Sequence, residues 1–189
     1  MQSKAARGQR IIHLRIASDI AIVSPVPFKP NSHHRSGCPV SVSLELLGDR
    51  WSLLIIRDMM VRGYRTFRQF EESGEGIATN ILSDRLKKLL ASKIISSEAD
   101  KADRRKVSYR LTEKGIDLAP VLLELLLWGA RHEVTAASRA VIDEMQRNRG
   151  AILAEVRRRW RECDSSPLLV NGEWRLPLAD ASPVERKSA

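Results

Sequence analysis

The sequence has little cysteine and no long hydrophobic run, and each shortage excludes a class of protein. Its two cysteines, Cys38 and Cys163, are too few for a disulfide scaffold or a cysteine-rich zinc site and fit a reducing compartment. The most apolar run, residues 121–128, is interrupted by Glu124 and is far shorter than the roughly 18 residues of a membrane-spanning helix. The N-terminus lacks the apolar core of a signal peptide. We therefore expect a cytoplasmic protein.

The sequence also lacks the signatures of common enzymes. It contains no P-loop, no glycine-rich dinucleotide turn, no G-x-S-x-G and no H-E-x-x-H. Its four histidines do not combine with acids or thiols at the spacing of a metal site. We therefore predict that the protein is not an enzyme and needs no metal or cofactor.

Positive charge is in excess and is unevenly distributed. Lysine and arginine number 32 against 23 acidic residues, which gives a net charge of +9. Such an excess favours a polyanionic partner, either nucleic acid or an anionic membrane surface. Residues 1–37 carry +5 of this charge, with three prolines and little periodicity. We interpret them as a flexible basic extension preceding one domain of ordinary size.

Residues 38–133 show start and stop signals for several helices and one hairpin. The boundaries are marked by threonines at expected helix starts, by prolines in first turns and by glycines after apolar runs. Leu82, Leu86 and Leu89 share one face of an amphipathic helix. The expected elements are helices at 39–47, 51–62, 67–72 and 79–92, strands at 94–98 and 107–111, and a helix after Thr112 that Pro120 kinks or divides.

This order predicts a mainly α fold with a small β-wing, the winged helix-turn-helix. In that fold one helix enters the major groove of DNA and the wing meets the flanking backbone. Asn, Ser and Thr side chains can bond to base edges, and Lys and Arg to phosphates. The polar face of the helix at 79–92 offers Thr79, Asn80, Ser83, Asp84 and Lys87, and the predicted wing tip offers Lys101, Arg104, Arg105 and Lys106.

Two acidic residues near these groups have other expected roles. Asp84 is better placed to pair with Lys88 one turn on than to read a base. Asp103 is expected to orient Arg104 or Arg105. For an isolated helix, a polar face of this kind would simply be solvated surface.

Five segments occur in the order typical of HxlR-type regulators, which are MarR-like bacterial transcription factors. They are Cys38-Pro39 and residues 48–55, 67–70, 77–86 and 109–115. The chain resembles this family over about residues 38–133. The resemblance implies a homodimer that binds operator DNA and more often represses than activates. The candidate DNA-binding residues are Thr79, Asn80, Ser83, Lys87, Lys88, Lys101, Arg104 and Arg105.

Cys38 precedes Pro39 at an expected helix start, where the helix dipole favours a thiolate. Some members of the resembling family use a cysteine at this position as a redox or electrophile sensor. Cys38 is therefore a candidate redox sensor, and the alternative is a small capping residue. The effector, if one exists, is unknown.

The helix after Pro120 is apolar on nearly every side, which a monomer of this size would struggle to cover. We expect its exposed residues to form a dimer interface. The candidates are Val121, Leu122, Leu125 and Trp128. For Trp128, as for Trp51, packing in the core is favoured over a ligand pocket.

The remaining residues lie largely outside the resemblance. Residues 134–163 read as a C-terminal helical extension weakened at Gly150, and residues 164–189 as a poorly packed tail. The arginines at 157–161 are either extra DNA contacts or a solvated helix end. Two alternatives stay open for the whole chain: a winged-helix module that binds protein, or a nonspecific DNA-binding protein. Strong salt dependence of binding to duplex DNA would exclude the first.

Overall fold

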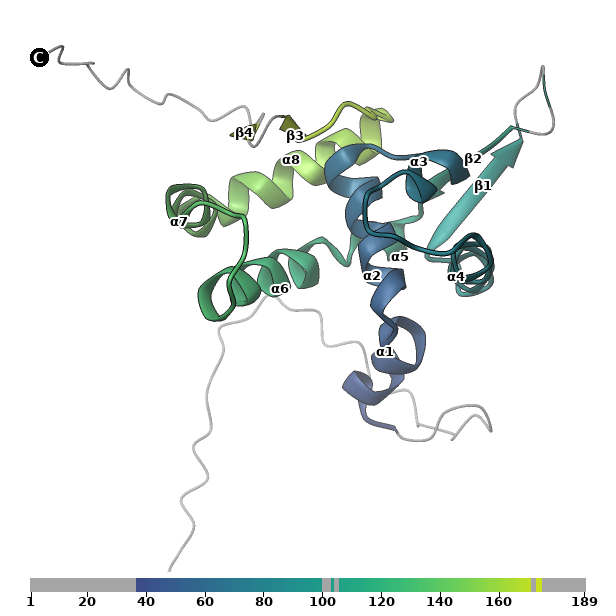
Figure 1. The fold of residues 1–189 in the computed structure, drawn as a ribbon, viewed down its shortest axis with the longest axis horizontal. Helices are drawn as coiled ribbons and strands as arrows, with labels where there is room; N and C mark the ends of the chain where they lie inside the picture. Colours follow the sequence, from purple (N-terminus) through teal and green to yellow (C-terminus); the bar gives the residue numbers. More distant parts are fainter. Residues whose placement is uncertain (1–36, 100–102, 104–105, 171–172, 175–189) are drawn as a thin grey trace, which may run out of the picture.

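A computed structural model describes residues 37–99, 103, 106–170 and 173–174. It confirms a mainly helical chain with a small antiparallel wing (Figure 1). The helices are α1 (Pro39–Leu47), α2 (Arg50–Arg57), the π-helical turn η1 (Asp58–Arg62), α3 (Phe67–Glu71), α4 (Thr79–Ala91), α5 (Glu113–Ile116), α6 (Ala119–His132), α7 (Arg139–Arg147) and α8 (Arg149–Glu162). The strands are β1 (Ile95–Ala99), β2 (Val107–Leu111), β3 (Leu169–Val170) and β4 (Glu173–Trp174).

Helix α2 lies at the centre of the molecule (Figure 1). Helix α4 and the wing lie on one side of it, and α6, α7 and α8 lie on the other. Apolar residues at helical spacing converge between these layers, because a helix of 3.6 residues per turn repeats its buried face every three or four residues. The core includes Ile55, Ile56, Met59, Leu82, Leu86, Leu89, Leu123 and Leu127.

Local signals fix most of the helix boundaries as predicted. Thr66 caps α3 in a reciprocal capping box with Gln69. Pro120 lies in the first turn of α6, so it divides α6 from α5. The helix predicted at 51–62 differs in detail, because α2 passes into the π-helical turn before Gly63 ends it with a φ of 70°.

The wing is anchored at its base on both sides. Ile95 of β1 pairs with Leu111 of β2, and both side chains are buried. On the other edge of β2, the Tyr109 amide donates to the Arg65 carbonyl at 2.7 Å. Only Asp103 and Lys106 of the predicted wing tip are described, and Lys101, Arg104 and Arg105 lie outside the described residues.

The C-terminal extension packs more closely than its sequence suggests. The helical extension predicted at residues 134–163 consists of two helices, α7 and α8, which meet at Asn148. Beyond α8, Leu168 is fully buried and its amide donates to the Val61 carbonyl at 2.8 Å. The first part of the expected tail is therefore packed on the domain, because Leu168 fills the core beside η1.

Candidate nucleic-acid interface

Helix α4 presents two faces of opposite character. Leu82, Leu86 and Leu89 are buried. The opposite face is polar and accessible: Thr79, Asn80, Asp84 and Lys87 are exposed and Ser83 is half-buried. The structure thus brings the predicted recognition residues together on one surface. Ala78 occupies the N-cap position and supplies no side-chain cap, so the first-turn amides keep their capacity to bond an anion.

Asp49 joins the start of α2 to the middle of α4. Its carboxylate caps α2 by accepting from the Trp51 and Ser52 amides, at 3.0 and 2.9 Å. Its Oδ2 atom also lies 3.3 Å from Arg85 Nη1 and 3.4 Å from Lys88 Nζ. Partial burial opposes ionisation, but the hydrogen bonds from Ser52 and Trp51 and the charge of Arg85 hold the pKa of Asp49 below its usual value.

The expected pairing of Asp84 with Lys88 is wrong. Lys88 lies beside Asp49, whose carboxylate is already fixed in place as the cap of α2. Lys88 is also only half-exposed, so the free cation on this face of α4 is Lys87 among the described residues. Sequence spacing could not reveal this, because residues 49 and 88 are far apart in the chain.

Two arginines hold the turn that leads into α4. Arg57 Nη2 lies 2.7 Å from Asp58 and 2.9 Å from Glu75. Arg62 donates to the Ser73 carbonyl at 2.8 Å. Burial raises the pKa of Asp58, although Arg57 and Arg62 oppose the effect. The turn between α3 and α4 is therefore tied to α2 and η1, which fixes the position at which α4 begins.

The wing contributes one described cation to this side. Lys106 is exposed directly before β2, and its amide donates to the Asp103 carbonyl at 2.8 Å.

The arginines at 157–161 differ from Lys106, because most of them make ion pairs within the protein. Arg157 pairs with Asp117 at 2.7 Å, and Arg158 and Arg159 pair with Glu155.

Apolar side chains are exposed along two helices. On α6, Val121, Leu125 and Trp128 are 47%, 48% and 58% exposed, and on α1, Val40 and Leu44 are 66% and 60% exposed. Leu122 instead packs against the core. The expectation that Trp128 is a core residue is wrong, whereas Trp51 does pack against the core. Both helices lie in the lower part of the molecule as drawn in Figure 1.

Cys38 occupies the N-cap position of α1 and is exposed. Backbone hydrogen bonds from Ser41 and Val40 lower the pKa of its thiol. This is the environment that the sequence predicted. Cys163 is also exposed, but it lies at the end of α8, in a left-handed conformation.

Within the described ranges, no helix combines the length and the apolar character that crossing a membrane requires. Those ranges also hold no group of three or more His, Cys, Asp or Glu residues placed to bind a metal ion.

Comparison with known proteins places this geometry in one family. The profile of HxlR-like helix-turn-helix proteins matches residues 46–136. The HTH-type transcriptional regulator YodB of Bacillus subtilis is 36% identical over 48% of this chain and 81% of its own length. Rv3095 of Mycobacterium tuberculosis, an uncharacterised HTH-type transcriptional regulator, is 38% identical over 52% of this chain, which spans 61% of that relative.

A solved structure is similar to this chain in fold and in sequence. The crystal structure of PA1607, a candidate transcription factor, superposes with a TM-score of 0.51 and 34% identity. The match covers 57% of this chain and 73% of that one. Helices α7 and α8 lie beyond the residues that the family profile matches.

Proposed function

Because the chain belongs to the family of HxlR-like helix-turn-helix proteins, we propose that it binds operator DNA in a sequence-specific manner and represses transcription. The observation that carries the proposal is the exposed polar face of α4. This face is held in place because Asp49 contacts α4 and because Arg57 and Arg62 contact the turn between α3 and α4.

The chemistry of this face suits the major groove. Asn80 is exposed in the first turn, and an asparagine amide can donate to and accept from adenine in one bidentate pair. Thr79 and Ser83 can bond to base edges or phosphates, and Lys87 supplies charge for the DNA backbone. Lys101, Arg104 and Arg105 of the wing, together with Lys88 once it leaves Asp49, add phosphate contacts in this proposal.

The proposed active unit is a homodimer. The exposed stripe of Val121, Leu125 and Trp128 is spaced by four and three residues, so it forms one face of α6. An apolar stripe of this kind is stabilised by burial against a second copy. A two-fold dimer would place its two α4 helices in major grooves about 10 bp, or a multiple of it, apart. The operator should then be roughly palindromic.

Selection from a randomised duplex library at moderate salt tests the proposal. Enrichment of a roughly palindromic site would support a sequence-specific dimer. Retention without enrichment would contradict it and indicate a nonspecific DNA-binding protein. If no duplex is retained, the winged-helix module that binds protein becomes the better account.

A further inference from the structure

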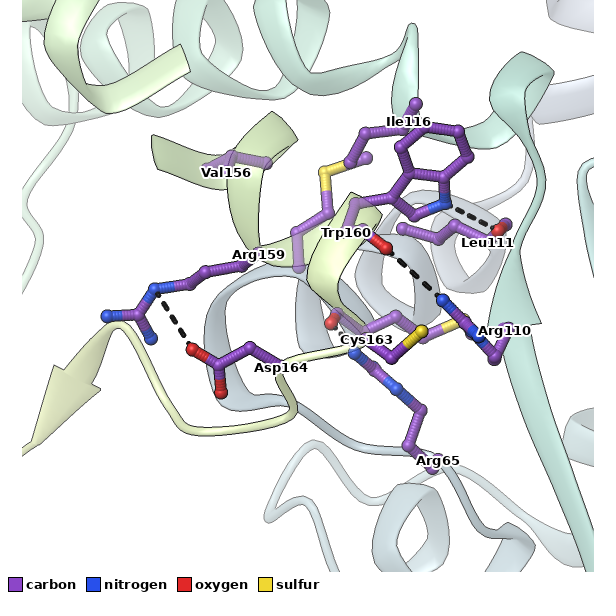
Figure 2. Close-up of a pocket in the computed structure, with 11 residues that line it drawn as sticks. Arg65, Arg110, Leu111, Ile116, Val156, Arg159, Trp160, Cys163 and Asp164 are labelled. Atoms are coloured by element: carbon purple, nitrogen blue, oxygen red, sulfur yellow. Dashed lines mark hydrogen bonds and ion pairs between the residues drawn. The ribbon is translucent and has the colours of Figure 1, made fainter. Parts of the chain in front are cut away.

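The last turn of α8 is joined to the end of the wing strand β2 by a reciprocal pair of hydrogen bonds. Trp160 Nε1 donates to the Leu111 carbonyl at 2.8 Å, and Arg110 Nη2 donates to the Trp160 carbonyl at 3.2 Å (Figure 2). The two bonds run in opposite directions between neighbouring residues of β2 and one residue of α8. They connect the C-terminal extension to the wing of the DNA-binding domain.

The end of α8 is itself held firmly. The guanidinium of Arg159 lies 2.7 Å from the buried carboxylate of Glu155, within the same helix. The chain then passes so close to Gly63 that a Cβ atom there would lie 1.8 Å from the Ser165 carbonyl oxygen. It is anchored again at Leu168. The position of Trp160 is therefore fixed, and β2 is hydrogen-bonded to it.

The junction between β2, η1 and α8 is closely packed. The cavity there is only about 20 Å³, which is room for one water-sized group. Its walls include Met59, Leu111, Val156 and Trp160. Across the junction, Arg65 donates to the Met59 carbonyl at 2.8 Å, and burial and the neighbouring Arg110 lower the pKa of Arg65. Movement of β2 would thus disturb polar and apolar contacts together.

We propose that α8 braces the wing through Trp160, and that Trp160 is a positioning residue for the contacts of the wing with DNA. A two-stranded hairpin is at best marginally stable alone, so its orientation depends on what its base contacts. The backbone of Arg65 holds one edge of β2, and Trp160 holds its end. The DNA part of this inference rests on the proposed function, whereas the brace itself does not.

Trp160→Phe tests the brace, because phenylalanine keeps an aromatic ring and removes the indole donor. Arg110→Gln removes the second bond and serves if Trp160→Phe does not fold. Arg157→Gln is the matched control, since Arg157 lies on the same helix and pairs with Asp117, away from the wing. The full-length variants are compared by hydrogen exchange of residues 107–111 and by the salt dependence of duplex binding.

We expect Trp160→Phe to speed exchange of these amides about two- to tenfold, the effect of one hydrogen bond on local stability. Duplex affinity should fall a few-fold with a shallower salt slope, and Arg157→Gln should change neither. Unchanged exchange would overturn the brace. Faster exchange with unaltered affinity and slope would overturn the positioning role. If the wild-type protein binds no duplex, the proposed function fails, while the exchange comparison still decides the brace.

Discussion

The carboxylate of Asp49, at the start of α2, lies 3.3 Å from the guanidinium of Arg85, in the middle of α4. One side chain thus caps α2 and fixes the rotation of α4 relative to it. The polar face of α4 is directed outward partly because Arg85 and Lys88 are held on the inner side by this acid.

Replacement of Asp49 should weaken stability in two separable steps. Asp49→Asn keeps an N-cap acceptor and removes the charge, so we expect a loss of about 1 kcal/mol from a half-exposed ion pair. Asp49→Ala also removes the cap and should cost about 1 kcal/mol more. Urea unfolding measures the free energy of unfolding of both variants, and Asp84→Asn is the control because Asp84 is an exposed acid on α4. Equal stability of the two Asp49 variants would contradict the separate contribution of the cap.

Glu155 should make stability depend on pH in the acid range. Hydrogen bonds from Arg158 outweigh the effect of burial and, with those from Arg159, lower the pKa of Glu155 to about 2 from an ordinary value of 4.5. Because the folded-state pKa is depressed, this stabilisation is fully present above about pH 4.5 and is lost as the pH falls toward 2.

The Glu155→Gln variant should therefore be less stable at pH 7, by on the order of 3 kcal/mol, and its stability should vary less between pH 4.5 and 2. Thermal unfolding across this range is the measurement. Glu162→Gln is the control, because Glu162 is exposed and pairs with the same Arg158. Parallel pH profiles for wild type and Glu155→Gln would contradict the assignment.

A charge on the apolar stripe of α6 should separate the proposed dimer. Leu125→Glu places a carboxylate at the centre of the stripe, where an interface would have to desolvate it. Light scattering should then report a monomer for this variant. Val134→Glu is the matched control, because Val134 is a fully exposed apolar residue beyond the end of α6. A dimer that persists in Leu125→Glu would place the interface elsewhere.

Cys38 should react with electrophiles faster than Cys163, since backbone hydrogen bonds lower the pKa of the Cys38 thiol. Timed alkylation followed by mass spectrometry compares the two sites in one sample. If Cys38 also senses oxidants, peroxide should alter operator binding by wild type and by Cys163→Ser but not by Cys38→Ser. The same response in all three proteins would remove Cys38 from the regulatory proposal.

If α4 reads bases and the wing contacts phosphates, substitutions in the two elements should affect DNA binding differently. Asn80→Ala should relax base preference at one operator position, whereas Arg105→Ala should weaken binding to all sequences and flatten the salt slope by about one. Site selection repeated with each variant, and titrations at several salt concentrations, distinguish the two. An unaltered site preference in Asn80→Ala would refute its role in base reading.

Most of the secondary structure could be read from the sequence, because its signals are local. The capping box at Thr66 and the proline in the first turn of α6 act within a few residues of themselves. The spacing of the leucines in α4 is enough to predict a buried face. The same spacing identifies the polar face, so the predicted recognition residues did come together on one surface.

The tertiary structure alone decided which charges pair and what the C-terminal extension does. Lys88 contacts Asp49 rather than its neighbour Asp84, because an ion pair depends on distance in space and on a fixed acceptor. Trp160 reaches Leu111 across 49 residues of sequence. No local pattern encodes such contacts, since they arise only once the core has placed α8 against the wing.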